Sequence, residues 1–453
     1  MNIKDMVKSR RQEIIDNITT LVSYPSVENL NEAPTPFGFE NAKVLEAALK
    51  MCESYGFTTK NLDNYAGYAE MGSGEKLIGV IGHLDVVPVS DGWSTDPFTA
   101  TLKDGRLYGR GTSDDKGPVV CAMIAMSIVK QLRPDMNKRV RLIMGCNEES
   151  GSRCLAHYVE KEGHIDYGFT PDGPFPGCHG EKGMVGASFH CPVVKIRSIN
   201  GGTVSNVVCA KVTIEAETDS YDSDQLNRFF NEHNISYTET VNGDTTTVVV
   251  IGSAAHASTP EVGVNAISYA IEGLYVAGMQ DPFVEFYHDV IGLGYNGEKM
   301  NIDFEDEYGK LTLNVGVIHT ENGVVSGTID IRFPVTMHSE QITEGMLNAT
   351  KARNLGSVTI HRTGEPLFFP MDSDLVSVLL QSYQEVTGDT DSKPVTMGGG
   401  TYAKGIHNCI AFGGSFADTG NTHMHDNDEF ITLNDIDRQT EIYVHAILKL
   451  LDL

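Results

Sequence analysis

The sequence has few basic residues and no long apolar run. Its 34 lysines and arginines stand against 61 aspartates and glutamates, which gives a net charge of −27 over 453 residues. No run of Lys and Arg of the kind that follows a phosphate backbone is present, so nucleic acid and anionic membranes are not expected as partners. The longest apolar run, Val119 to Val129, is interrupted by Ser127 and is too short to span a bilayer. No membrane segment is therefore expected.

Other absences narrow the class of protein further. The eight cysteines show no C-x-x-C spacing and no dense framework, which indicates reduced thiols in a cytoplasmic protein. Neither a G-x-x-x-x-G-K-[ST] phosphate loop nor a G-x-S-x-G nucleophile elbow occurs, so nucleotide binding and serine hydrolysis are not expected. Residues 3–22 mix charged and apolar side chains at helical spacing, which predicts a surface helix rather than a signal peptide.

Strand and helix signals alternate in the first part of the chain. The expected elements are strands at 76–82, at 139–145 and up to about Thr170, and helices at 116–132 and 154–162. This alternation predicts an α/β fold with a mostly parallel sheet flanked by helices. In open sheets of this kind ligands bind beyond the carboxyl ends of the strands. His83, Glu148 and Asp172 all fall at such ends.

The pattern changes from about residue 185 to strand-like runs, such as 212–215 and 246–251, separated by Asn-Gly and Gly-Gly turns. A helix at 262–276 is expected after Ser258-Thr259-Pro260-Glu261, which supplies a cap, a first-turn proline and an early acid. Signals of the first kind return with a helix at 375–386, a strand at 409–413 and a helix at 434–451. We therefore expect a catalytic domain in two parts, 1–184 and 368–453, with an inserted α+β lid domain, 185–367, of two subdomains.

Acids and histidines form five clusters along this chain. They are His83-x-Asp85, Asp114, Glu148-Glu149, Asp172 and His425-x-x-x-Glu429. Two divalent ions about 3.5–4 Å apart need ligands from several loops, one carboxylate between them and a base beside their water. The clusters supply each part once, so their spacing predicts a two-metal hydrolytic site.

The residues alone suggest some roles within these clusters and leave others open. An extended backbone points His83 and Asp85 to one side, so Asp85 can hold the imidazole N–H. Two adjacent acids after a buried strand, at 148–149, are costly unless cations or protons compensate; one as ligand and one as base would resolve that cost. Spacing does not choose between Asp114 and Asp115 as the carboxylate between two ions, or between His423 and His425 as the C-terminal ligand.

In order, the motifs HLDVVP, GRGTSDDKG, NEESG, TPDG and HDNDE resemble a family of co-catalytic di-zinc peptidases and amidases. This family includes aminoacylase, carnosinase, acetylornithine deacetylase, desuccinylase and bacterial peptidase V. The sequence is most similar to the dipeptidases of the peptidase V type, because TPDGPFP, GSAAHASTPEVGVNA and MGGGTYAK look like that branch. The fold that the resemblance implies is a zinc-peptidase-like catalytic domain with an inserted lid.

The resemblance also implies a role for individual residues. The implied metal ligands are His83, Asp114, Glu149, Asp172 and His425, with Asp114 as the bridge. Asp85 matches the acid that orients a ligand, Glu148 the general base, and His256 the residue that stabilises the oxyanion. Asn206, Arg332 and the glycine loop with Gly399 and Gly400 match substrate-binding positions. Lys404 ends this loop where several relatives have Arg.

The activity implied by the resemblance is hydrolysis of unblocked dipeptides, with β-alanyl dipeptides among the candidates. Two divalent ions, zinc first and manganese or cobalt as alternatives, would act with Glu148 to form hydroxide from a bridging water. The alternatives are an N-acyl amino acid deacylase or desuccinylase on the same site and a non-catalytic, metal-dependent binding protein. The insert resembles the doubled lid of peptidase V, which implies a monomer in which His256 acts within its own chain.

Overall fold

The computed structural model describes residues 2–453, which form two compact units. Unit 1 contains the chain up to Gly180, Phe369–Thr396 and Gly400–Leu453. Unit 2 contains Glu181–Phe368 and Met397–Gly399, so its main segment is inserted into the sequence of unit 1. Each unit has its own large sheet and its own helices.

The sheet of unit 1 has the strand order β1-β2-β6-β3-β7-β23-β9. Its strands are β1 (Thr58–Leu62), β2 (Ala66–Gly72), β3 (Leu77–His83), β6 (Arg139–Gly145), β7 (Tyr167–Thr170), β9 (Cys178–Glu181) and β23 (Cys409–Ala411). The neighbours β6, β3, β7 and β23 are parallel, whereas β1, β2 and β9 pair in antiparallel fashion. Every residue of β3 is buried, as expected for a strand covered on both faces. The parallel strands that we predicted are therefore the centre of a mixed sheet.

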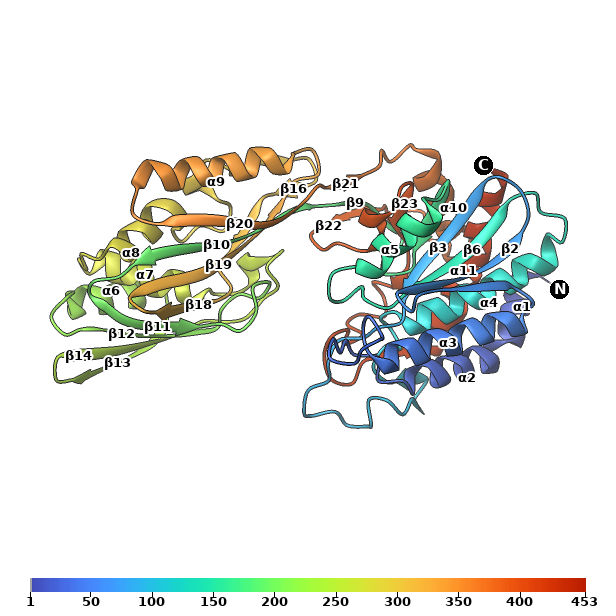
Figure 1. The fold of residues 1–453 in the computed structure, drawn as a ribbon, viewed down its shortest axis with the longest axis horizontal. Helices are drawn as coiled ribbons and strands as arrows, with labels where there is room; N and C mark the ends of the chain where they lie inside the picture. Colours follow the sequence, from blue (N-terminus) through green and yellow to red (C-terminus); the bar gives the residue numbers. More distant parts are fainter. Residues whose placement is uncertain (1) are drawn as a thin grey trace. The chain divides into compact units, whose positions relative to one another are not determined.

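Helices cover this sheet and form the outer layers of unit 1. They are α1 (Ile3–Ser9), α2 (Arg11–Val22), α3 (Phe39–Ser54), α4 (Lys116–Leu132), α5 (Arg153–Glu162), α10 (Asp374–Thr387) and α11 (Leu433–Asp452). The apolar α4 packs beside α11 and against β3 and β6 (Figure 1). The single helix predicted for residues 3–22 is wrong, because the chain leaves the helical conformation at Arg10, with φ −107° and ψ 3°.

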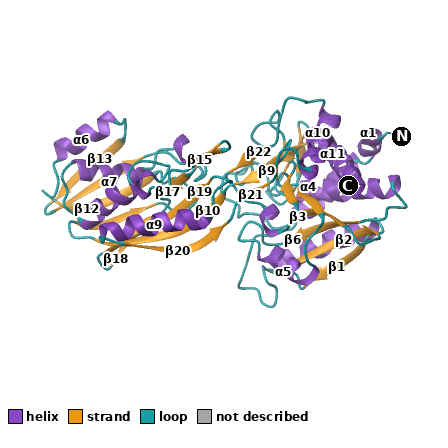
Figure 2. Cartoon of the chain, turned by 90° about the horizontal axis from the view of Figure 1, so that it is seen from above, coloured by secondary structure: helices purple, strands orange, loops and turns teal. Residues whose placement is uncertain are grey.

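Unit 2 is built on one continuous antiparallel sheet of order β13-β14-β12-β11-β18-β19-β10-β20, with β17 paired to β19. The strands are β10 (Gly183–Pro192), β11 (Ile196–Gly201), β12 (Lys211–Glu217), β13 (Ser236–Asn242), β14 (Thr245–Ile251), β17 (Thr312–Asn314), β18 (Ile318–Glu321), β19 (Val324–Phe333) and β20 (Ser357–Gly364). The helices gather on one face of the sheet (Figures 1 and 2): α6 (Ser223–Glu232), α7 (Ala266–Val276), α8 (Pro282–Phe286) and α9 (Ser339–Arg353). Aliphatic and aromatic side chains, such as Ile214, Phe189 and Phe283, form the core.

The start of α7 differs from the prediction. Pro260–Val262 forms a short 3-10 turn, and the chain is extended at Gly263, with φ −105° and ψ −175°. The helix begins only after Asn265, whose side chain accepts the main-chain N–H groups of Ile267 and Ser268. Asn265 is therefore the N-cap, and the cap predicted within Ser258-Thr259-Pro260-Glu261 is wrong.

Candidate metal centre

Three neighbouring strands of unit 1 end next to the predicted ligands. β3 ends at His83, Glu148 follows β6 after two residues, and Asp172 follows β7 after one. Because β6, β3 and β7 are parallel neighbours, their carboxyl ends lie at one edge of the sheet. The strand order thus brings together residues that are far apart in the sequence.

Asp114 reaches this edge from the loop before α4. Gly82 in β3 permits the close approach, because a Cβ atom there would stand 2.6 Å from Oδ2 of Asp115. The Asp114 carboxylate lies between two imidazoles: Oδ1 is 2.9 Å from Nε2 of His83, and Oδ2 is 3.0 Å from Nε2 of His425. Asp115 instead accepts the main-chain N–H of His83 at 3.1 Å. Of the two acids that spacing left open, Asp114 has the arrangement of a bridging carboxylate.

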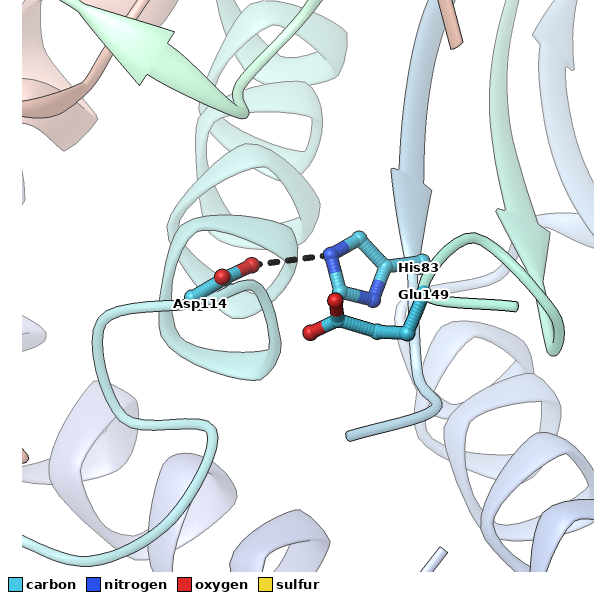
Figure 3. A group of neighbouring side chains, drawn as sticks. All are labelled: His83, Asp114 and Glu149. Carbon is cyan, nitrogen blue, oxygen red and sulfur yellow. Dashed lines mark hydrogen bonds and ion pairs between the residues drawn. The ribbon is translucent and has the colours of Figure 1, made fainter. Parts of the chain in front are cut away.

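Further acids stand beside the two imidazoles. Nε2 of His425 is 3.1 Å from Oε1 of Glu149, and Nε2 of His83 is 4.0 Å from Oδ2 of Asp172. Two groups of possible metal donors each lie within 4.8 Å of one another: His83 with Asp114 and Glu149, and His83 with Glu148 and Asp172. Figure 3 shows the side chains of the first group pointing toward one another from a strand end and two loops.

The loop that carries the two candidate C-terminal ligands, His423 and His425, has an unusual backbone. His423, His425 and Asp428 have φ angles of 60°, 62° and 59°, a left-handed conformation that side chains other than glycine rarely adopt. The loop is tied down where Ser94 donates its N–H and its hydroxyl to Asp428, at 2.8 and 2.9 Å. His425 turns to the acids, whereas the ring of His423 lies 6.1 Å from that of Phe430. The structure thus places His425 at the site.

Asp85 supports two of these segments at once. Nδ1 of His83 is 3.0 Å from the main-chain oxygen of Asp85 and 3.5 Å from its carboxylate. The carboxylate itself accepts the main-chain N–H groups of Glu148 and Glu149, both at 3.1 Å. The shorter contact of the imidazole is therefore to the main chain of Asp85, while we expected the carboxylate. A ring that donates from Nδ1 keeps a lone pair on Nε2, the atom that faces Asp114.

Crowding and burial shift the pKa values of these groups. Burial raises the pKa of Glu148 well above its usual value, and neighbouring negative charges add to the shift. Burial and the charge of Asp114 also raise the pKa of Glu149. Burial would likewise raise the pKa of Asp114, but hydrogen bonds from His425 and His83 outweigh it and hold that pKa low. Hydrogen bonds to Asp114 and Glu149 in turn raise the pKa of His425 to about 11. The acids therefore favour positive charge among them.

The donor chemistry fits divalent cations. Imidazole nitrogen and carboxylate oxygen are ligands that zinc accepts, and manganese and cobalt accept them too. The carboxylates of Asp114 and Glu149 make their ion pairs with imidazoles, where a cation can take the place of a proton. Asp114 contacts His83 through one oxygen and His425 through the other, as a carboxylate shared by two ions requires.

Two predicted residues of unit 2, Asn206 and His256, lie side by side. Ala257 donates its N–H to the main-chain oxygen of Asn206 at 2.9 Å, and Val207 forms a β-bridge with His256. Both Asn206 and His256 are exposed. Nδ1 of His256 accepts the main-chain N–H of Ser258 at 3.1 Å, so the proton of the neutral ring lies on Nε2.

Arg332 lies in β19 and is nearly buried. Its Nε and Nη2 donate to the two oxygens of Asp330 at 2.7 and 3.1 Å, and its Nη1 donates to the main-chain oxygen of Gly398 at 3.1 Å. A guanidinium has five N–H groups, so these bonds leave two. The glycine loop continues from Gly399 in unit 2 to Gly400 in unit 1, and Lys404 follows in a short 3-10 helix, Tyr402–Gly405.

A sequence model described as Peptidase family M20/M25/M40 matches residues 79–449. The chain belongs to this family. This M20 chain is 33% identical over 467 residues to "Putative dipeptidase YtjP" of Bacillus subtilis, covering 99% of the chain and 100% of the relative. It is 32% identical over 470 residues to "Putative dipeptidase SSP1012" of Staphylococcus saprophyticus, covering 99% of each.

The fold is shared with solved structures. The crystal structure of human carnosine dipeptidase 1 matches 100% of this M20 chain and 98% of that chain, with a TM-score of 0.59 and 18% identity. The predicted family and the predicted α/β fold with an inserted α+β domain are thus confirmed. Within residues 2–453, no helix combines the length and the apolar character that a membrane span requires.

Sequence reasoning missed residues of this M20 chain that hold the site segments in place. The buried Asn314 donates to the main-chain oxygens of Ser205 and Val207, on either side of Asn206, at 3.0 and 3.1 Å. The pattern His425-x-x-x-Glu429 assigns no contact to the buried Glu429, although its carboxylate accepts the main-chain N–H of Asp114. The pairing of Arg332 with Asp330 had a signal, because residues two apart on a strand share a face.

Proposed function

We propose that this chain is a metal-dependent dipeptidase that hydrolyses unblocked dipeptides. The observation that carries the proposal is the Asp114 carboxylate, whose two oxygens face two different imidazoles at 2.9 and 3.0 Å beside further acids. Membership of a peptidase family and similarity to proteins named dipeptidases support the choice of substrate. In this proposal unit 1 is the catalytic domain and unit 2 the lid, with the first boundary at Gly180 and Glu181, four residues before the one predicted from the sequence.

Two divalent ions would be held by five residues: His83, Asp114, Glu149, Asp172 and His425. Zinc is the first candidate, and manganese or cobalt would suit the same donors. Such ions polarise a scissile carbonyl and lower the pKa of a bound water to about 7. Asp114 would be shared by the ions, with His83 and Asp172 to one side and Glu149 and His425 to the other.

Glu148 would move the proton. Its carboxylate lies within the donor group of His83 and Asp172, and Asp85 fixes its main chain through a hydrogen bond of 3.1 Å. It would take a proton from the attacking water and pass it to the amine that leaves when the peptide bond breaks. Asp85 would act as a positioning residue for both His83 and Glu148.

Unit 2 would hold the substrate. The two N–H groups left on Arg332 suit a free carboxylate, and Asp330 already fixes the plane of the guanidinium. The Nε2–H of His256 is the donor that a developing oxyanion needs, and Asn206 lies next to it. Gly399 and Gly400 would leave room for the peptide main chain.

A panel of substrates tests this function. Free dipeptides, including β-alanyl ones, are compared with N-acetyl and N-succinyl amino acids, before chelation, after chelation and after zinc or manganese is restored. We expect rapid cleavage of free dipeptides that chelation abolishes and metal restores. Full activity in the metal-free protein would refute the metal-dependent mechanism. Faster cleavage of the N-acyl compounds would make the protein a deacylase instead.

We further propose that the protein works as a cytoplasmic monomer. All eight cysteines are buried, and reduced cysteines are the rule in a reducing compartment. The length of the insert supports a complete substrate site within one chain. A mass of one chain by light scattering, unchanged over a range of concentrations with substrate present, is the expected result.

A further inference from the structure

Glu429 is a fully buried carboxylate, four residues after His425, for which the proposed function has no role. Its Oε2 accepts from the guanidinium of Arg110 at 2.8 Å. Its two oxygens also accept main-chain N–H groups at 2.8–3.1 Å, from Gly111, Ser113 and Asp114. We propose that Glu429 is a positioning residue that sets Asp114 and His425 in place for metal binding. This inference rests on the proposed function, because it requires metal at these two residues.

The contact with the Asp114 loop fixes the base of the shared ligand. Oε1 of Glu429 accepts the N–H of Asp114 itself at 3.1 Å and that of Ser113 at 2.8 Å. The main chain of Asp114 is held by these two bonds, and its carboxylate oxygens lie 2.9 Å from Nε2 of His83 and 3.0 Å from Nε2 of His425. A short side chain has few rotamers, so the position of its main chain decides where its oxygens stand.

The same residue fixes the loop of His425. The main-chain oxygen of Glu429 accepts the N–H of Gly109 at 2.9 Å, and Phe430 donates its N–H to Thr422 at 3.1 Å, which closes the loop. The hydroxyl of Ser113 adds a bond of 3.1 Å to that of Thr422. A loop that holds several residues in the left-handed conformation needs such anchors to keep one shape. Glu429 therefore joins two ligand segments that lie about 300 residues apart in the sequence.

A general contribution to stability can be separated from this positioning role by comparison with another buried carboxylate. A buried ion pair such as Arg110–Glu429 is by itself weak evidence of stabilisation, because desolvation offsets the attraction. Asp281 of unit 2 offers a matched comparison. It is also fully buried, and one of its oxygens accepts three main-chain N–H groups, from Val194, Lys195 and Ile196. None of the predicted metal ligands is in unit 2. Asp281 is therefore a buried carboxylate that accepts main-chain N–H groups, as Glu429 does, but it holds no segment that carries a predicted metal ligand.

The test compares Glu429→Gln with Asp281→Asn. Each change replaces a buried carboxylate by an amide of the same shape, which turns one acceptor into a donor that faces other donors. Affinity for Zn²⁺ or Mn²⁺ alone is measured by calorimetry on metal-free protein, together with the visible spectrum of the Co²⁺ form and the unfolding midpoint. We expect both variants to unfold more easily. Glu429→Gln should lose about 10- to 100-fold in metal affinity and change the cobalt spectrum, since losing a partner of a ligand has effects of this size.

Metal affinity of Glu429→Gln within about twofold of the parent, or an equal loss in Asp281→Asn, would overturn the inference. If Glu429→Gln does not fold, Glu429→Asp keeps the charge and shortens the side chain by one CH₂. That variant should still bind metal more weakly than Asp281→Asn, and equal affinity would also refute the role. A parent protein that binds no metal would overturn the proposed function as well. If the parent binds metal tightly and Glu429→Gln binds it equally well, this inference alone is refuted.

Discussion

Replacing Glu148 and Glu149 in turn separates proton transfer from metal binding. The two residues are neighbours after β6, and each donates its main-chain N–H to a different oxygen of Asp85 at 3.1 Å. A change from Glu to Gln alters neither the main chain nor the length of the side chain, so each variant removes one charge at a fixed place. We expect Glu148→Gln to keep its metal and lose turnover, and Glu149→Gln to lose metal, because an oxygen beside His425 is lost.

The size of the first effect follows from the surroundings of Glu148. A general base contributes about 10²–10⁴-fold to rate, or about 2.7–5.5 kcal/mol. The other carboxylate in its donor group, Asp172, is a proposed ligand, and a bound cation would make its oxygens much less basic, so Asp172 would be a poor substitute for Glu148. The loss of kcat should therefore approach the upper limit, about 10⁴-fold. Released amino acid gives kcat at saturating dipeptide, and atomic emission gives metal per chain. Turnover within tenfold of the parent at full metal content would remove Glu148 as the base.

Three further changes test other parts of the site. Asp85→Asn should destabilise the metal-free protein by about 1–3 kcal/mol in urea, because one of two N–H groups loses its acceptor, and unchanged unfolding would contradict this. His425→Ala should lose bound metal and His423→Ala should retain it; equal metal content in the two variants would refute the assignment. Arg332→Lys should reduce the preference for dipeptides with a free rather than an amidated carboxyl group by about tenfold or more, since a lysine cannot form the fork. An unchanged ratio would place the carboxylate elsewhere.

The sequence was sufficient where local pattern decides the structure. β3, α4 and β6 lie within one residue of their predicted bounds, and their ends place His83 and Glu148 at one edge of the sheet. Local pattern failed where contacts distant in sequence decide. The cap of α7 is Asn265 because the side chain of that residue also donates to Asn314 and to the main chain of Val315, contacts that the local pattern at 258–261 could not reveal.

The choice between His423 and His425 shows that local pattern also fails to decide which residues form the site. Both residues lie in one polar loop, and their φ angles are nearly equal, so neither spacing nor local conformation separates them. Tertiary contacts distinguish the two rings: His425 faces the acids that precede α4 and follow β6, whereas the ring of His423 lies near that of Phe430. The resemblance to a known family indicated His425 indirectly, because the motifs of a family reflect residues that the shared fold brings together.

The buried carboxylates of the site divide into two kinds by what compensates their charge. Asp85 and Glu429 accept main-chain N–H groups, and Glu429 also pairs with Arg110, so the protein itself supplies the partners of their oxygens. Asp114 and Glu149 face imidazoles, which carry positive charge only while protonated. The fold thus supplies hydrogen-bond partners for the carboxylates that position the site. The charges of Asp114 and Glu149 are left to be balanced by protons or cations. A cation binds most tightly where ligands are fixed in advance but their charge is not yet compensated, because little reorganisation then opposes binding. The two kinds of carboxylate together provide both conditions.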